Sequence, residues 1–327
     1  MTRNERDETG APSVLSGKVH EWLAQEGYPL EYYVASCFSG FRFRVQQGAY
    51  VRVPDEAPRE VDVLAAMEIR HPEYRRLTRA YTVVECKWTK SKPWVAFTAR
   101  TGRMMESAVI AQTISSELGE SAVWLNAGER RLQNLQLFSS PEMPAFGGRQ
   151  ALGGGSDVFY NSLRSVAGAA SALTKRYDRY RAPDEFPYMA VVAFPLIVID
   201  GSLFSASYDS SDDKMLLEEV HHVRFHWRGD PSSPLLTTVD VVTREGLPAF
   251  AEQRAKDTQK LLAVLDKTSD QLDKCWTSKS LKHLERKSGS TGISGSPRLL
   301  YSIHKRSQGA SPELGEAQSS PPVTPAA

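Results

Sequence analysis

Two charged residues interrupt an apolar segment of the chain and limit how it can fold. The segment reads Thr82-Val83-Val84-Glu85-Cys86-Lys87-Trp88, and its β-branched and aromatic residues predict a strand. Because side chains alternate between the two faces of a sheet, Glu85 and Lys87 should lie on one face. Burying charge costs free energy unless the charge is paired or binds a metal ion. The segment therefore predicts either a functional site or a buried ion pair.

A second apolar segment, Arg59-Glu60-Val61-Asp62-Val63-Leu64, places an aspartate in another predicted strand. If the two strands are neighbours, Asp62 and Glu85 come together as paired oxygen ligands. A structural salt bridge between Lys87 and one of these carboxylates is the alternative interpretation. Two further (D/E)xK sequences, at 212–214 and 285–287, lie outside apolar strands and carry no such prediction.

Hydrophobic periodicity predicts an alternating α/β order. The expected helices are Lys18 to Phe38 in two pieces, 103–118, 159–180 and Leu247 to Leu265. The expected strands are 41–53, 60–67, 80–88, one or two within 122–138, 189–199, 203–208, 220–227 and 237–243, with a loop over 141–157. The clearest helix has an apolar stripe made by Phe159, Leu163, Val166, Ala170, Leu173 and Tyr177. This order indicates a sheet with helices on its faces.

These residues together resemble the PD-(D/E)xK, or restriction-endonuclease-like, superfamily. The family pattern is an aspartate at the end of one strand and (D/E)xK on the next, and Asp62, Glu85 and Lys87 match it. Glu31 matches a glutamate that the first helix of the family often carries, whereas Val61 stands where proline is common. The resemblance covers residues 28 to 97, and the helix and strand at 159–199 fit the rest of the family core.

The resemblance implies an αβββαβ core with a central mixed sheet flanked by helices. This chain would form one domain over residues 16–277, with an insertion near 100–155 and additional strands and a helix at 203–265. The termini, 1–15 and 278–327, are rich in Ser, Gly, Pro and charge, which is typical of disordered segments. The second of these is basic over 278–306, as in a phosphate-binding arm or a solvated tail.

The function that the resemblance implies is metal-dependent hydrolysis of phosphodiester bonds, with DNA favoured over RNA. Asp62, Glu85 and the main-chain carbonyl of Cys86 would bind Mg²⁺, or Mn²⁺ in its place. Lys87 would orient or help activate the attacking water, and Glu31 would hold a metal-bound water or a second ion. The alternatives are a nucleic-acid-binding or scaffold protein without turnover, and a structural subunit of a larger defence or repair assembly. A homodimer is compatible with each.

Residues just after the motif could contact nucleic acid. Lys90 and Lys92 are expected to contact the phosphate backbone and Trp94 to stack on a base, with a core position as the alternative for Trp94.

A histidine-rich strand forms a weaker candidate site. His222, Arg224 and His226 alternate along 220–227, so they share one face. We expect this face to be solvated or to contact phosphate, and a metal site is the less favoured interpretation.

Composition excludes some other classes of protein. Three cysteines without a CxxC pair argue against a disulfide framework or a cysteine zinc site. The net charge of +1 neither favours nor excludes nucleic acid as a partner. The polar start and the short apolar stretch at 188–199 predict a cytoplasmic protein with no membrane segment.

Overall fold

The computed structural model of the chain describes residues 14–52, 58–88, 92–152, 158–178, 182, 185–228, 236–284 and 297–308. The helices are α1 (Val14–Gln25), α2 (Tyr28–Gly40), α3 (Glu106–Ala111), α4 (Glu117–Leu125), α5 (Arg130–Gln133), α6 (Val158–Lys175), α7 (Leu247–Ser278) and α8 (Arg298–Ser307). The strands are β1 (Arg44–Val51), β2 (Arg59–His71), β3 (Arg76–Trp88), β4 (Trp94–Thr98), β5 (Ile114–Ser115), β6 (Ala145–Gln150), β7 (Met189–Asp200), β8 (Leu203–Asp209), β9 (Lys214–Glu219), β10 (His222–Trp227) and β11 (Thr237–Thr243).

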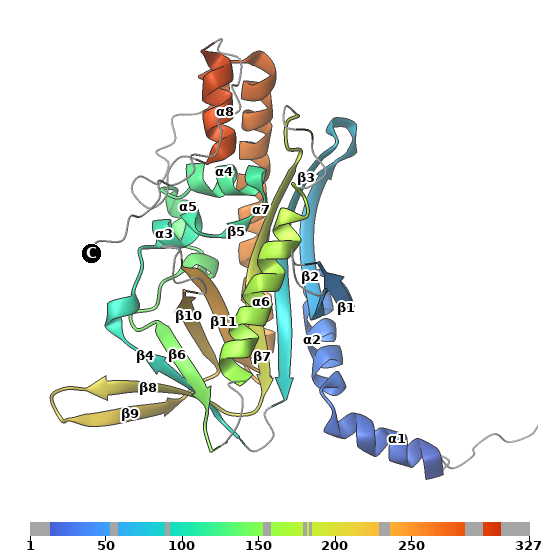
Figure 1. The fold of residues 1–327 in the computed structure, drawn as a ribbon, viewed down its shortest axis with the longest axis vertical. Coiled ribbons are helices and arrows are strands. Elements are labelled where there is room, and N and C mark those ends of the chain that lie inside the picture. The colour runs from blue at the N-terminus through green and yellow to red at the C-terminus, as the bar shows by residue number, and fades with distance from the viewer. Residues whose placement is uncertain are drawn as a thin grey trace, which may run out of the picture.

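One large mixed sheet contains all of these strands (Figure 1). Its order is β1-β2-β3-β7-β11-β10-β6-β4-β8-β9, and β5 pairs with β7 off this path. β1, β2 and β3 are joined as antiparallel neighbours, whereas β3, β7 and β11 run parallel. The parallel pairing of β3 with β7 requires a crossover, and α6 lies in that connection. The carboxyl ends of β3, β7 and β11 therefore meet at one edge of the sheet.

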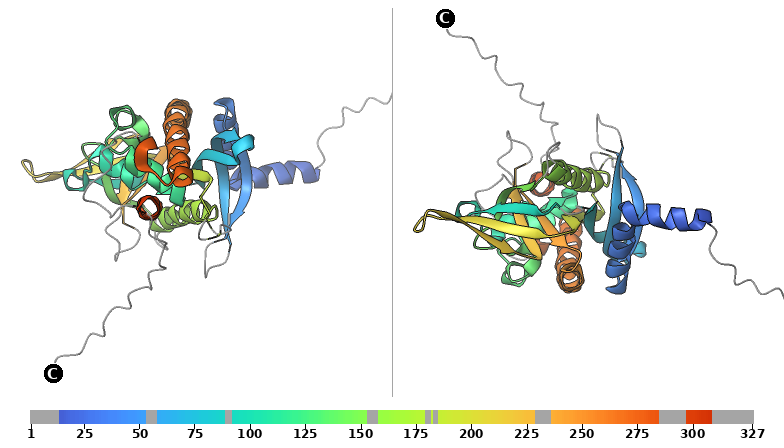
Figure 2. Two further views of the ribbon diagram at one scale, coloured as in Figure 1. Left: turned by 90° about the horizontal axis from the view of Figure 1, so that it is seen from above. Right: turned by 90° about the horizontal axis from the view of Figure 1, so that it is seen from below.

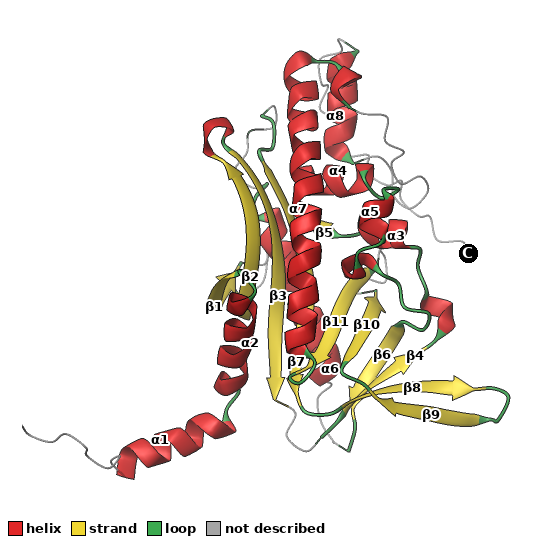
Figure 3. Cartoon of the chain, turned by 180° about the vertical axis from the view of Figure 1, so that it is seen from behind, coloured by secondary structure: helices red, strands yellow, loops and turns green. Residues whose placement is uncertain are grey.

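Helices cover both faces of the sheet. α6 lies on one face, seen in front in Figure 1, and α2 and α7 lie on the other, seen in front in Figure 3. α6 was predicted from its apolar stripe, and its stripe residues from Phe159 to Leu173 are buried as expected. The ring of Phe159 packs 4.8 Å from that of Trp94 and 5.1 Å from that of Phe225. The sequence expectation of a mixed α/β sheet flanked by helices is confirmed.

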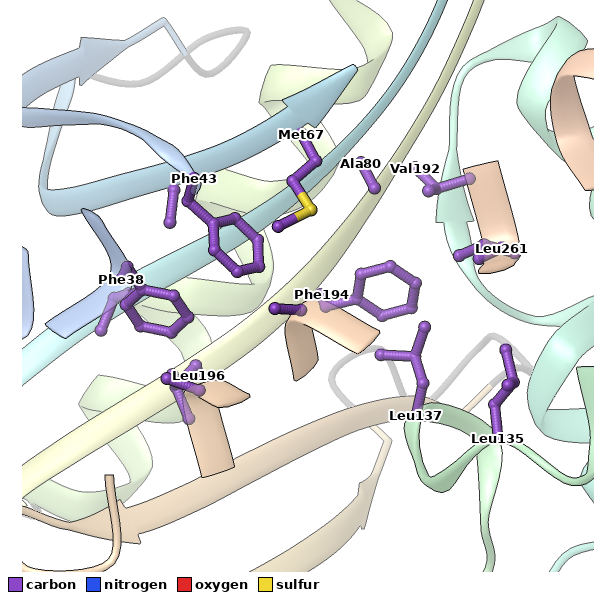
Figure 4. Packing of buried hydrophobic residues seen from close by; sticks show 14 of the residues in the cluster. Phe38, Phe43, Met67, Ala80, Leu135, Leu137, Val192, Phe194, Leu196 and Leu261 are labelled. Carbon is purple, nitrogen blue, oxygen red and sulfur yellow. The ribbon is translucent and has the colours of Figure 1, made fainter. Parts of the chain in front are cut away.

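The face under α2 and α7 holds the largest core cluster. Figure 4 shows Phe38 of α2 and Phe43 beside Met67 of β2 and Leu196 of β7, with Leu261 of α7 at the other end of the same cluster. The rings of Phe38 and Phe43 lie 5.1 Å apart in an edge-to-face arrangement, which aromatic pairs favour. β7 is buried from Ala190 to Ile199, which explains why its sequence is apolar without alternation.

Three predictions between the core elements were wrong. The helix expected over 103–118 is interrupted, because α3 ends at Ala111 and β5 precedes α4. Residues 122–138 form the end of α4, α5 and a 3₁₀ turn at Gln136–Phe138, not strands. The region 141–157, which we expected to be a loop, contains β6. β9 was not predicted, because each of its residues is exposed and no hydrophobic pattern marks it.

The C-terminal region is more ordered than its composition suggests. α7 continues to Ser278, beyond the predicted end at Leu265. α8 packs against α4 and α7 and buries Leu299 and Ile303, so the prediction of disorder is wrong for 298–307. The predicted disorder at 1–13, 285–296 and 309–327 falls outside the described residues. No helix in the described ranges is both long enough and apolar enough to cross a membrane.

The contact between α4 and β7 depends on a glycine. A Cβ atom at Gly119 would lie 2.5 Å from the carbonyl oxygen of Val191, which is too close for backbone to tolerate. Gly119→Ala should therefore force α4 away from β7 and destabilise the fold by about 1–3 kcal/mol. Gly17→Ala in α1 is the matched control, because nothing lies within 4 Å of the added methyl group. Thermal unfolding measures both, and an unchanged melting temperature for Gly119→Ala would contradict this packing.

Candidate functional site

The site begins where β2 and β3 separate. Their paired register runs from His71↔Arg76 to Val63↔Val84. The next residue of β2 is Asp62, and its Oδ2 accepts a hydrogen bond from the main-chain N–H of Cys86 at 2.6 Å. A side chain thus replaces the strand carbonyl that would otherwise continue the ladder, and it holds the Asp62 carboxylate between the two strand ends.

Glu85 lies across from Asp62 when the register is continued by one residue. Its Oε1 is 2.6 Å from Nζ of Lys87, and its Oε2 accepts a hydrogen bond from Oγ of Ser165 at 3.2 Å. Because Ser165 belongs to α6, these contacts place Glu85 and Lys87 together on the α6 face, as alternation predicted. The side chain of Glu85 is 13 % exposed and that of Lys87 is 31 % exposed. Lys87 is thus paired with Glu85 and still partly open to solvent.

Burial and neighbouring charges shift the pKa values of the acidic groups. The pKa of Asp62 is raised to about 7, chiefly by burial. The Cys86 N–H and the charge of Lys87 lower it, and the negative charges of Glu85 and Glu31 add to the rise. The pKa of Glu31 is raised by burial and then by Glu60, while Lys87 lowers it. The carboxylates therefore act on one another across the site.

The basic partner and the thiol are shifted as well. Burial lowers the pKa of Lys87, but the pair with Glu85 outweighs this effect and the pKa is raised. Lys87 is therefore a stable cation here. Burial holds the pKa of the Cys86 thiol well above its usual range, so this side chain is a neutral part of the core.

The predicted cluster is brought together. Asp62, Glu85 and Lys87 come from adjacent strands, and Glu31 in the first turn of α2 is close enough to feel the charges of Glu85 and Lys87. The arrangement unites one helix and two strands at the carboxyl edge of β3.

The donor set suits a hard cation. Asp62 and Glu85 offer carboxylate oxygens, and the carbonyl of Cys86 points to the same side of its strand as the N–H that Asp62 accepts. Within the described ranges, no three His, Cys, Asp or Glu side chains form a ready-made metal-binding group. A metal site here would thus consist of two carboxylates and a main-chain carbonyl, the set that the family resemblance implies.

The expectation that Trp94 stacks on a base of a nucleic acid is wrong. Its side chain is fully buried against Phe159, so it cannot stack on a base, and the core alternative holds. Lys92 is exposed just before β4 and stays a candidate, whereas Lys90 falls outside the described residues.

Sequence reasoning missed other residues at this edge. Ser165 lies beside the apolar stripe of α6, so its contact with Glu85 becomes visible only once the helix is packed on the sheet. Arg244, just after β11, pairs with Asp200 at 3.0 Å and stacks over the ring of Tyr33 at 4.7 Å. No sequence pattern connects Arg244, Asp200 and Tyr33, because they come from separate elements.

Comparisons with family models, curated proteins and solved structures give no significant match to this chain. The function is therefore inferred from the geometry of the chain itself.

The histidine-rich strand has a structural role. Arg224 is buried, and it binds both carboxylate oxygens of Asp240 at 2.8 and 3.1 Å. Arg254 and His222 contact the same carboxylate at 2.5 and 2.8 Å. His226 is buried too, so the expectation of a solvated face is wrong for Arg224 and His226, while His222 is 42 % exposed.

This network joins several elements. Arg224 also donates to the carbonyl oxygens of Gln136 and Ser139 at 2.8 and 2.7 Å, which ties the 3₁₀ turn to β10. The guanidinium of Arg254 lies over the rings of Phe194 and Phe250. It forms one wall of a hollow of about 660 Å³ between β10 and the start of α7.

Removing the shared carboxylate should unfold this region. Asp240→Asn leaves two buried guanidinium groups without their counter-ion, and we expect a loss of about 3–5 kcal/mol. Glu252→Gln is the control, because its pair with Lys256 at 2.7 Å is exposed on α7 and should contribute about 0–1 kcal/mol. Urea unfolding of both variants tests this, and equal stabilities would show that the network contributes little.

Asp62 gives the pH dependence of stability a defined sign. Because its pKa rises from 3.8 to about 7 in the fold, the folded protein keeps a proton between these values that the unfolded chain has released. The stability from this group is present at low pH and is lost as the pH rises through 7. In EDTA, Asp62→Asn should therefore be more stable than the parent at about pH 8, and the difference should shrink towards about pH 5.

Thermal unfolding across this pH range measures the difference in stability between Asp62→Asn and the parent. Glu142→Gln is the control, because Glu142 pairs with Arg100 on the surface. A structural salt bridge predicts the opposite sign. Strong destabilisation by Asp62→Asn at the higher pH would support that interpretation.

Proposed function

We propose that the chain is a divalent-metal-dependent nuclease of the restriction-endonuclease-like type that hydrolyses phosphodiester bonds in DNA. The observation that carries this proposal is the convergence of Asp62, Glu85 and Lys87 where β2 and β3 separate. Two carboxylates and a lysine at a strand edge are the groups that such hydrolysis needs.

The order of elements supports the same proposal. α2 is followed by the antiparallel strands β1, β2 and β3. After an insertion that runs from β4 to β6, the chain continues with α6 and with β7, which runs parallel to β3. α2 and α6 cover opposite faces of these four strands. Apart from this insertion, the order is compatible with the αβββαβ core that the resemblance implies, and this supports the proposal.

The residues divide the chemistry between them. Asp62, Glu85 and the carbonyl of Cys86 would hold Mg²⁺ or Mn²⁺. When bound, this ion would neutralise charge on the scissile phosphate and lower the pKa of a water. Lys87, anchored by Glu85 and partly exposed, is placed to orient that water and to stabilise the charge that develops on the phosphate. Glu31 adds a third carboxylate on the α2 side.

A nucleic-acid-binding or scaffold protein without turnover is the alternative. One observation favours it: Glu85 already has both oxygens engaged, by Lys87 and by Ser165. In this alternative the cluster is a satisfied ion pair and needs no metal.

Cleavage assays separate the two functions. Plasmid and linear DNA should be cut by the parent with Mg²⁺ or Mn²⁺ and not with EDTA. Lys87→Ala should lower cleavage by about 10²–10³-fold, as expected for a group that stabilises developing charge. Lys175→Ala, an exposed lysine at the end of α6, is the matched control and should cut like the parent.

Metal binding is measured in the same proteins by the rise of the melting temperature with added Mn²⁺. The parent and Lys87→Ala should both respond, and Asp62→Asn should respond much less. A parent that neither cuts DNA nor responds to the metal would overturn the proposal and leave the scaffold alternative.

A further inference from the structure

β8 and β9 form a hairpin that extends beyond the rest of the sheet. It projects from the body on the side opposite α1 (Figure 2). β4 pairs with β8 only from Leu203 to Ala206, so the outer hairpin is a ribbon of two strands among the described residues. A ribbon of two strands is at most marginally stable in water by itself. The outer hairpin would therefore gain stability from a further strand.

The exposed edge of this hairpin has three apolar residues in a row, flanked by charged ones. β9 ends the strand order, and all six of its residues are exposed. Leu216 is 44 % and Leu217 is 62 % exposed, and Met215 and Tyr208 are similarly open. An open apolar edge strand is a template for pairing with another strand.

The register of the hairpin shows which backbone groups are available. The N–H of Val220 donates to the carbonyl of Leu203 at 2.9 Å, and Phe204 pairs with Glu219. In an antiparallel pair the hydrogen-bonded residues alternate. Lys214, Leu216 and Glu218 therefore direct their N–H and C=O groups towards β8. The intervening residues Met215, Leu217 and Glu219 direct theirs outward.

We propose that β9 pairs antiparallel with β9 of a second copy of this chain, about a twofold axis at Leu216. Such an axis stands perpendicular to the sheet, so side chains keep their face and each residue meets one of the same parity. With Leu216 opposite its own copy, Met215 lies opposite Leu217 of the second copy. These are outward-directed residues, so each pair can exchange two backbone hydrogen bonds.

Among the residues of β9 itself, charge favours this register. Lys214 comes to lie opposite Glu218 of the second copy, twice in the dimer, in the pairs where cross-strand side chains approach most closely. Moving the axis to Leu217 would set Leu216 against Glu218 and remove both ion pairs. Within its own chain Lys214 contacts Asp212 at 2.5 Å, but both side chains are exposed, and such a pair contributes little.

Sedimentation of the full chain tests the proposal. The parent should have twice the 36.3 kDa mass of one chain. Lys214→Glu and Glu218→Lys each bring like charges together and should weaken the dimer by about tenfold or more, while the double variant should restore it. Because the two positions are about 14 Å apart along one strand, this rescue can only report contact between chains. In dilute solution, the melting temperatures of the two single variants and the double variant should equal that of the parent.

A cross-link locates the axis. Leu216→Cys should give a disulfide-linked dimer on mild oxidation, because the Cα atoms of directly opposed residues are close enough for the bond. Leu217→Cys is the matched control and should link much less, since Leu217 faces Met215. A parent that stays monomeric at high micromolar concentration overturns the proposal. A dimer that is indifferent to both single charge changes also overturns it.

Discussion

The parallel pairing of β3 with β7 is the contact on which the rest of the structure depends. It runs without interruption from Leu77↔Met189 to Trp88↔Asp200, and it fixes both where β3 ends and which way its side chains face. A slip of one residue would turn Glu85 and Lys87 into the core under α2 and α7 and expose Val84 and Cys86 in their place. Burying the charges of Glu85 and Lys87 makes such a slip costly, so the core specifies the position of the charged residues.

This pairing also explains why the site lies at an edge. The carboxyl ends of parallel strands are where backbone pairing stops and side chains can converge. Here the convergence is reinforced from the other side, because β2 leaves β3 at Asp62. α6 adds Ser165 and α2 adds Glu31, so that four separate elements meet where the sheet opens.

How far the sequence predicts this arrangement depends on how each residue is stabilised. β2, β3, β7 and α6 were predictable because burial imposes a regular apolar pattern on them, and that pattern also exposed Asp62, Glu85 and Lys87 as exceptions. The segment 122–138 was not, because short apolar runs such as those around Val123 and Leu135 suit a helix or a strand equally well. The burial of Trp94 could not be predicted for a related reason: the local sequence of an aromatic residue beside lysines does not show whether the side chain faces solvent or the core. The pairing of Asp240 with Arg224 and Arg254 depends on tertiary contacts that no local pattern records.

The hydrogen bond from Cys86 to Asp62 has a consequence for how this chain can change over evolutionary time. Position 62 ends a ladder, and an uncharged acceptor of the same shape would end it equally well without the cost of a buried charge. Selection for stability alone would therefore be expected to replace the aspartate. If descendants of this chain keep the aspartate, its charge has been selected for function despite the cost in stability. Replacement by asparagine would identify lineages in which the charge is no longer needed.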